Sequence, residues 1–158
     1  MYTRISKTFR WEMAHRLPFH TGGCRNVHGH SYSMTIELAG EPNEQGMLID
    51  YFDIKAIVQP FVDEVDHSFL CDSTDEVIVA FLKETGLKAV FVDFPTTAER
   101  IAEWFYERLA GEFVAYKNIR ELRVAVAETE NSSAEVSGEI RISIPNTRVL
   151  QHQAHMLE

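Results

Sequence analysis

Two stretches of the chain alternate between apolar and polar residues with a period of two. The first covers residues 3–15 and ends in Phe9, Trp11, Met13 and His15; the second covers residues 30–39. Because side chains at i and i+2 project from the same face of a strand, this pattern is typical of half-buried strands in an antiparallel sheet. The same alternation predicts two more strands near the C-terminus, at residues 121–129 and 134–144.

The middle of the chain has a helical period instead. Apolar residues at helical spacing predict a helix over residues 52–65, with Pro60 as a bend or a break within it. Ser73–Glu76 and Thr96–Glu99 both have the Ser/Thr-x-x-Glu pattern of a capping box. They therefore predict the starts of a short second helix, ending near Gly86, and of a third helix.

These elements predict one domain of the α+β class over residues 1–158, with a brief strand at residues 90–92. The order of the longer elements favours a four-stranded antiparallel sheet with helices on one face. The core is expected over about residues 3–145, and residues 146–158 lack periodicity and are expected to fray. Exposed edge strands favour pairing with another subunit, so a homo-oligomer is expected.

Composition narrows the possible functions. The 158 residues are 45% hydrophobic and 25% charged, as in an ordinary soluble domain. A net charge of -9 argues against a nucleic acid or an anionic membrane as partner. The sequence shows no apolar stretch of membrane-spanning length and no secretory leader, and its two cysteines are too few for a disulfide framework. A cytoplasmic location is the resulting expectation.

Three histidines carry the strongest chemical pattern. His28 and His30 lie two apart in C-R-N-V-H-G-H, before one alternating run, and His15 ends the other. Strand parity would align the three imidazoles, which with an open fourth position are the ligand set of a catalytic zinc ion. Cys24, four residues before His28, adds a thiol that a nearby cation would shift toward thiolate. The alternative is that H-G-H forms a turn with two solvated rings.

Other polar residues have two possible interpretations each. Asp66 beside His67 can orient the imidazole and raise its basicity, or His67 is simply favoured by the helix C-terminus. Glu128 ends an apolar strand face, where its carboxylate needs donors from a guanidine-like ring edge of a ligand, from a buried salt bridge, or from solvent at the strand end. Helix capping is a sufficient explanation for the remaining candidates: Thr96, Thr97 and Glu99.

Taken together, the motifs resemble a known family. Five segments resemble, in the same order, those of the 6-pyruvoyl-tetrahydropterin synthase and 6-carboxy-tetrahydropterin synthase family: W-E-M-A-H-R-L, C-R-N-V-H-G-H-S-Y, D-H-S-F-L, P-T-T-A-E and A-E-T. Together they span roughly residues 5–138. The resemblance implies the tunnelling fold (T-fold), in which trimers close four-stranded sheets into a barrel and two trimers make a hexamer.

The resemblance also implies roles for individual residues. It makes His15, His28 and His30 ligands of Zn²⁺, and Cys24 the catalytic base. Asp66 and His67 would form an acid–base relay, and Glu128 would anchor the aminopyrimidine edge of a pterin and take part in that relay as a catalytic residue. The segment that helps to bind the pterin ring, often from a neighbouring subunit, would include Thr96, Thr97 and Glu99.

The spacing of Cys24 and His28, with three residues between them, resembles the bacterial 6-carboxy enzymes of queuosine (7-deazapurine) biosynthesis; the animal-type pyruvoyl enzymes have a longer gap. We therefore expect a zinc-dependent lyase that converts 7,8-dihydroneopterin triphosphate to 6-carboxytetrahydropterin, acetaldehyde and triphosphate. The alternatives are a 6-pyruvoyl-tetrahydropterin synthase, a zinc hydrolase or lyase of another kind, and a non-catalytic zinc- or pterin-binding module. Departures from the family pattern that bear on substrate specificity occur at Cys71, at residues 82–93 and at Val136.

Overall fold

The computed structural model describes residues 1–140 of the chain. The predicted tail at residues 146–158, the end of the predicted core and the last part of the strand predicted at residues 134–144 lie outside this range. The elements follow in this order: β1 (Thr3–His15), a short 3₁₀ turn (Gly23–Arg25), β2 (His28–Gly40), α1 (Tyr51–Val65), β3 (Ser68–Asp72), α2 (Glu76–Thr85), β4 (Ala89–Val92), α3 (Ala98–Phe113), β5 (Ile119–Thr129) and β6 (Ser132–Glu139).

Six strands form one mixed sheet in the order β4-β3-β1-β2-β5-β6. The four long strands pair with one another in antiparallel fashion, as the alternating patterns predict. In contrast, β3 lies parallel to β1, and β4 lies parallel to β3. The prediction of a four-stranded, purely antiparallel sheet was therefore wrong, although its α+β class is correct.

The short strand β3 has no alternating pattern because both of its faces are covered. Its adjacent residues Leu70 and Cys71 are both fully buried, although neighbouring side chains in a strand point to opposite faces. A parallel strand buried on both sides is a short apolar run, which periodicity cannot separate from a helix. The brief strand predicted at residues 90–92 is present as β4.

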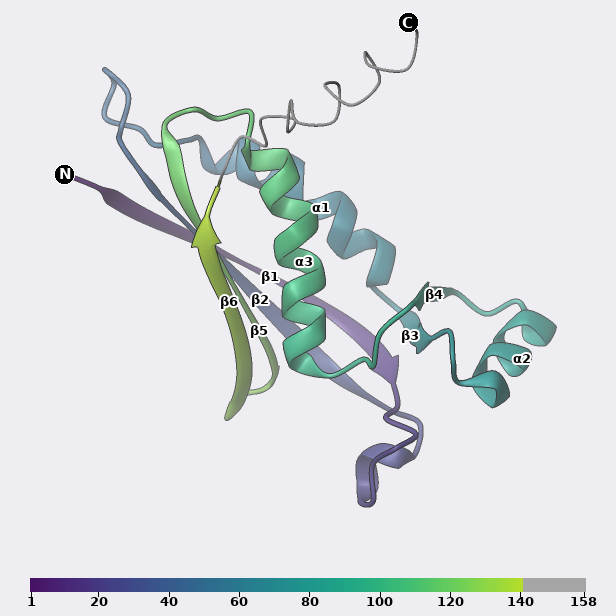
Figure 1. The fold of residues 1–158 in the computed structure, drawn as a ribbon. Helices are drawn as coiled ribbons and strands as arrows, with labels where there is room; N and C mark the ends of the chain where they lie inside the picture. The colour runs from purple at the N-terminus through teal and green to yellow at the C-terminus, as the bar shows by residue number, and fades with distance from the viewer. Residues whose placement is uncertain (141–158) are drawn as a thin grey trace, which may run out of the picture.

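The helices lie on both faces of the sheet, so the predicted one-sided arrangement holds only in part. Figure 1 shows α1 and α3 side by side against the long strands, with α2 beside β3 and β4 at one end. The main core lies under α1 and α3, whereas α2 packs Ile78 and Leu82 against Cys71 on the other face of β3. The α1 helix continues through Pro60 without a break. Within residues 1–140, no helix has the length and apolar character needed to cross a membrane.

The second helix begins two residues later than the capping pattern predicts. Its N-cap is Asp75, whose carboxylate accepts a hydrogen bond from the Ile78 backbone N–H. Ser73 donates its hydroxyl to the carbonyl oxygen of Val92 instead, and so fastens the loop to β4. Asp75 is buried and receives two hydrogen bonds from the Arg16 guanidinium, at 2.5 and 2.7 Å. This bidentate ion pair ties α2 to the residue that follows His15.

Replacing Asp75 with asparagine is expected to lower the free energy of unfolding at pH 7 by about 2–4 kcal/mol, because it breaks a buried ion pair and weakens a helix cap. Hydrogen bonds from Arg16 lower the pKa of Asp75. The stabilisation is therefore fully present above the pKa of about 3.9 of an unfolded aspartate and disappears as the pH falls through the lower folded value. Urea unfolding at several pH values measures the difference, with the exposed Glu84→Gln on α2 as the matched control. An equal difference at pH 7 and pH 2 would contradict this account.

The end of β2 approaches the start of β5 too closely for a side chain. A Cβ built on Gly40 would lie 2.0 Å from the carbonyl oxygen of Asn118. Because this neighbour is backbone, Gly40→Ala is expected to cost about 3 kcal/mol of unfolding free energy through overpacking. The matched control is Gly111→Ala on α3, where an added Cβ meets nothing within 4 Å; it should not destabilise. Equal midpoints in urea for both variants would refute the prediction.

Candidate metal centre

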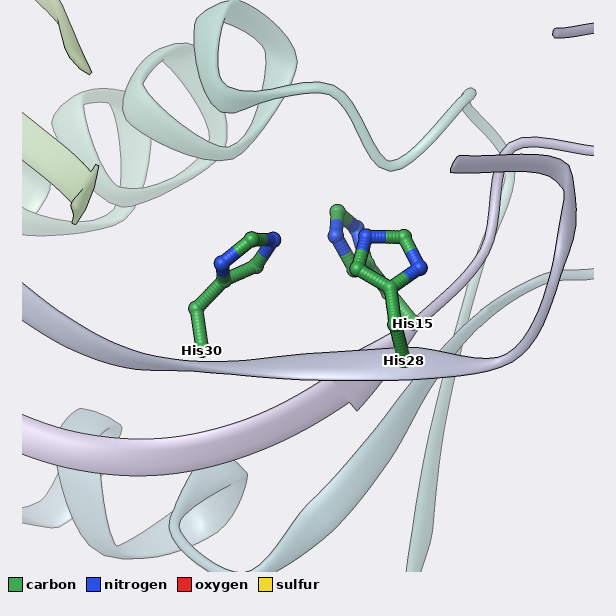
Figure 2. Close-up of side chains that lie close together, drawn as sticks. All are labelled: His15, His28 and His30. Atoms are coloured by element: carbon green, nitrogen blue, oxygen red, sulfur yellow. The ribbon is translucent and has the colours of Figure 1, made fainter. Parts of the chain in front are cut away.

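The β1–β2 hairpin brings three imidazoles together. His15 and His28 are directly opposite each other in the hairpin, and His30 is opposite Met13. All of these positions share the face that carries the main core, and His15 is only 1% exposed. Figure 2 shows the three rings converging, with His28 and His30 projecting from one strand and His15 from its neighbour. The predicted common face is therefore present in the structure.

Hydrogen bonds to backbone carbonyls hold two of these rings by their Nδ1 atoms. His15 Nδ1 lies 2.8 Å from the carbonyl oxygen of Thr96, and His28 Nδ1 lies 2.8 Å from that of Asn26. A carbonyl only accepts, so each Nδ1 atom carries a proton, and in the neutral ring Nε2 keeps the lone pair. Within residues 1–140, the buried His28 Nε2 has no hydrogen-bond partner. Anchoring by the second ring nitrogen is the usual support of a metal-bound histidine.

The donor atoms are spaced for one shared cation. One ligand nitrogen from each histidine lies within 4.8 Å of the other two. Ligands at tetrahedral zinc are roughly 3.3 Å apart when each bond is about 2.0 Å, so small ring rotations suffice to close the site. Burial lowers the pKa of His15, in opposition to the Thr96 hydrogen bond and to nearby Glu128, which raise it. The neutral, lone-pair-bearing form is the one that binds metal. The residues present fit Zn²⁺ with an open position.

The carbonyl that anchors His15 comes from the turn before α3. Thr96 is buried, and its hydroxyl donates to the carbonyl oxygen of Arg16 at 3.3 Å. Because Thr96 is occupied in this way, the N-cap of α3 is Thr97, one residue later than the capping box predicts. Thr97 accepts from the Arg100 backbone N–H, and Glu99 is exposed in the first helical turn. These residues thus place the N-terminus of α3 beside the histidines.

Glu128 lies at the same site. It is linked to His15 by Tyr32, a residue that the sequence patterns did not single out as a candidate. The Oε1 atom of Glu128 is 3.7 Å from His15 Nε2 and accepts a hydrogen bond of 3.2 Å from the Tyr32 hydroxyl. Tyr32 is fully buried, and its hydroxyl also lies 3.3 Å from His15 Nε2. Burial, followed by the charge of Glu128, raises the pKa of Tyr32. The available signal was strand parity, because Tyr32 continues the His28, His30 series on one face.

Cys24 lies in the loop that joins the two histidine-bearing strands. It is half-buried in the 3₁₀ turn Gly23–Arg25, and its carbonyl accepts a hydrogen bond of 2.8 Å from the Leu17 N–H, which closes the loop. Its sulfur is not one of the ligand atoms that lie within 4.8 Å of one another. In the part of the chain that the structure describes, the clustered ligand atoms therefore come from the three histidines and not from Cys24.

Asp66 and His67 form a dyad on the other face of the sheet. His67 Nδ1 lies 2.9 Å from Asp66 Oδ1, which also accepts from the Glu12 backbone N–H at 3.0 Å. That backbone hydrogen bond, followed by His67, lowers the pKa of Asp66. The His67 backbone has a φ of 53°, in the left-handed region that few side chains favour. Such strain is concentrated at functional positions.

His67 lines a groove of about 610 Å³, together with Glu12, His30, Ser31 and Phe69. Glu12 and Ser31 project from the face opposite to the one that carries the imidazoles. Within residues 1–140, no hydrogen bond or ring contact joins His67 to the three histidines. Among the residues that the structure describes, one chain therefore brings the three histidines together with Glu128, and His67 makes no hydrogen bond or ring contact with that cluster.

A family model described as 6-pyruvoyl tetrahydropterin synthase matches residues 4–139. The chain belongs to this family. Among its relatives is the 6-carboxy-5,6,7,8-tetrahydropterin synthase of Haemophilus influenzae, 40% identical over 114 residues, which cover 67% of this chain and 81% of that protein. The protein of the same name from Aquifex aeolicus is 31% identical over 162 residues, covering 88% and 100% of the two chains.

Solved structures agree with the family at the level of the fold. The 6-pyruvoyl tetrahydropterin synthase of Plasmodium vivax superimposes with a TM-score of 0.72 at 17% identity, covering 88% of this chain and 99% of that one. The Caenorhabditis elegans protein of that name gives 0.65 at 22% identity, over 87% and 96%. The curled α+β sheet is thus the fold of the tetrahydropterin synthases.

Proposed function

We propose that the protein is a zinc-dependent 6-carboxy-5,6,7,8-tetrahydropterin synthase that acts on 7,8-dihydroneopterin triphosphate in queuosine biosynthesis. The observation that carries this proposal is the cluster of three imidazoles beside the carboxylate of Glu128, in which the buried His28 Nε2 has no partner among the described residues 1–140. Relatives that share 31% and 40% identity with the chain bear the name of this synthase. The three-residue interval between Cys24 and His28 also favours it.

His15, His28 and His30 would hold the zinc ion. When bound, zinc supplies Lewis acidity that makes the side-chain hydroxyls of the substrate and the adjacent C–H groups more acidic. The hydrogen bonds of His15 and His28 to backbone carbonyls keep their Nε2 atoms aimed at the ion.

Glu128 would bind the aminopyrimidine edge of the pterin, because its carboxylate can accept from the ring N–H and amino groups. The backbone N–H groups at the start of α3, with Thr96, Thr97 and Glu99, would complete the ring site. Cys24 would then remove a proton from the side chain of the bound substrate. Overall, one water is consumed, and 6-carboxytetrahydropterin, acetaldehyde and triphosphate are released.

The acid–base dyad would come from a second copy of the chain. His67 is exposed, and within residues 1–140 no hydrogen bond or ring contact joins it to the histidine cluster of its own chain. A homo-oligomer, either a trimer or a dimer of trimers, would place Asp66 and His67 of one subunit beside the histidines of the next. The small-molecule substrate would then bind between subunits.

A second candidate is the 6-pyruvoyl reaction, in which the same substrate loses triphosphate without release of acetaldehyde. The description of the matching family model and the names of the solved structures favour it. The interval between Cys24 and His28 favours the 6-carboxy reaction, which we therefore place first.

One incubation separates these functions. The zinc-loaded protein is mixed with 7,8-dihydroneopterin triphosphate, and the pterin product is analysed by mass spectrometry, with acetaldehyde and triphosphate measured in parallel. A carboxyl group at C6 with stoichiometric acetaldehyde supports the proposal, whereas a pyruvoyl group at C6 would replace it with the second candidate. Binding without any product would indicate a non-catalytic zinc- or pterin-binding module. Zinc-free protein is the matched control.

A further inference from the structure

The buried phenol of Tyr32 lies between Glu128 and His15, the carboxylate and one of the imidazoles of the candidate site. Its oxygen is 3.2 Å from Glu128 Oε1 and 3.3 Å from His15 Nε2, and these two acceptors are themselves 3.7 Å apart. Tyr32 is 0% exposed, and the polar group of a buried side chain needs a partner. The hydroxyl therefore occupies a position between the pterin-binding carboxylate and a metal ligand.

The ring of Tyr32 is held on both sides, so its hydroxyl has a fixed position. Trp11, the residue opposite it in the hairpin, stacks on the phenol ring with centroids 5.4 Å apart and planes inclined by 7°. The imidazoles of His15 and His30 contact the ring edge-on, with centroids 6.1 and 5.5 Å away. A phenol packed in this way can orient a partner rather than follow it.

Hydrogen-bond capacity decides which partner the phenol serves in the loaded protein. The Nδ1–H of His15 donates to the Thr96 carbonyl, so Nε2 is the ligand atom that faces the site. A cation bound there uses the Nε2 lone pair, which removes it as an acceptor. Glu128 is then the one remaining acceptor among the two that the phenol reaches.

We propose that Tyr32 is a positioning residue for Glu128: its hydroxyl donates to the carboxylate and holds it in the orientation that binds the pterin ring edge. This inference rests on the proposed function, because it assigns the pterin to Glu128. A carboxylate with one oxygen fixed by a buried donor presents its remaining lone pairs in a defined direction. Without that donor the carboxylate can rotate. The entropy lost when the pterin then fixes it lowers the affinity for the pterin.

The test is binding of 6-methylpterin, a fluorescent pterin without side-chain hydroxyls, to zinc-loaded protein. Tyr32→Phe keeps the stacked ring and removes only the oxygen. Loss of a hydrogen bond to a charged group should weaken binding roughly tenfold. In a Glu128→Ala background the same Tyr32→Phe change should alter affinity less than about twofold, because the partner is already absent. Zinc content should be unchanged, and Tyr106→Phe, whose hydroxyl faces Gly138 on β6, is the matched control.

The outcomes are distinct. Equal affinity of Tyr32→Phe and wild-type protein would overturn the proposal, and so would an equal loss in both backgrounds, which would indicate a merely structural role for the hydroxyl. The same double-mutant cycle on kcat/KM provides a second readout of the coupling. Wild-type protein that binds no 6-methylpterin would overturn the assignment of Glu128 as pterin anchor itself, and the proposed function with it.

Discussion

Replacing Cys24 with alanine is expected to reduce kcat for 7,8-dihydroneopterin triphosphate about 10²–10⁴-fold, the usual contribution of a positioned acid or base. The physical reason is that the side-chain carbon of the substrate loses the thiolate that would take its proton. Zinc content should stay at one ion per chain, since the Cys24 sulfur is not part of the ligand cluster. Steady-state kinetics and metal analysis on the same preparation measure both effects.

The chain has a natural control in its second cysteine. Cys71 is buried between β3 and α2, and its pKa is raised to about 11 by burial, so it is not a base near neutral pH. Cys71→Ala should therefore retain turnover, although it costs some stability. Retention of most activity by Cys24→Ala would instead indicate a zinc hydrolase or another lyase that has no need of the thiol.

Replacing His28 with alanine is expected to weaken zinc binding by on the order of 10³-fold or more, because even an outer-shell partner of a metal ligand contributes about 10–100-fold. Among residues 1–140 its buried Nε2 has no hydrogen-bond partner, so the fold loses only the Nδ1 hydrogen bond to Asn26 and the packing of the ring. Isothermal titration with zinc measures the affinity. A second measure is the rise in melting temperature on adding zinc, which follows from binding to the native state alone and should vanish in the variant.

His20 is the matched control for this experiment. It is exposed in the same loop region, and its Nδ1 accepts a hydrogen bond from the Gly22 N–H. His20→Ala should bind zinc as the wild-type protein does. Undiminished zinc affinity in His28→Ala would show that the three imidazoles do not act as one ligand set.

The parts of the structure that depend on local periodicity could be predicted from the sequence. The strands over residues 3–15 and 30–39 were predicted because one face of each is buried and the other is solvated, and the structure begins the second one at His28. That same parity aligned the three histidines, and it placed Glu128 on the apolar face of β5. Each of these inferences needs only the two-residue repeat of a strand.

The remaining features depend on contacts between distant segments. The position of His67 on the opposite face follows from the parallel pairing of β3 with β1, which no pattern in either strand specifies. Likewise, Thr97 caps α3 because Thr96 is occupied by Arg16 and His15, 80 residues or more away along the chain. The Tyr32 hydroxyl could not be identified as part of the site from the sequence, because its partner Glu128 comes from the neighbouring strand β5, 96 residues further along the chain.

The direct pairing of His15 with His28 has an evolutionary consequence. Because strand pairing fixes these two positions against each other, the loop between Arg16 and Asn26 can gain or lose residues without displacing either ring, as long as Asn26 keeps its hydrogen bond to His28. A single insertion inside β2, in contrast, would turn the following side chains to the wrong face. The position of the Cys24 thiol can therefore change in evolution while the spacing of the imidazoles stays the same. Under the proposed function, a change in this surface loop alone would then be a route to a different product.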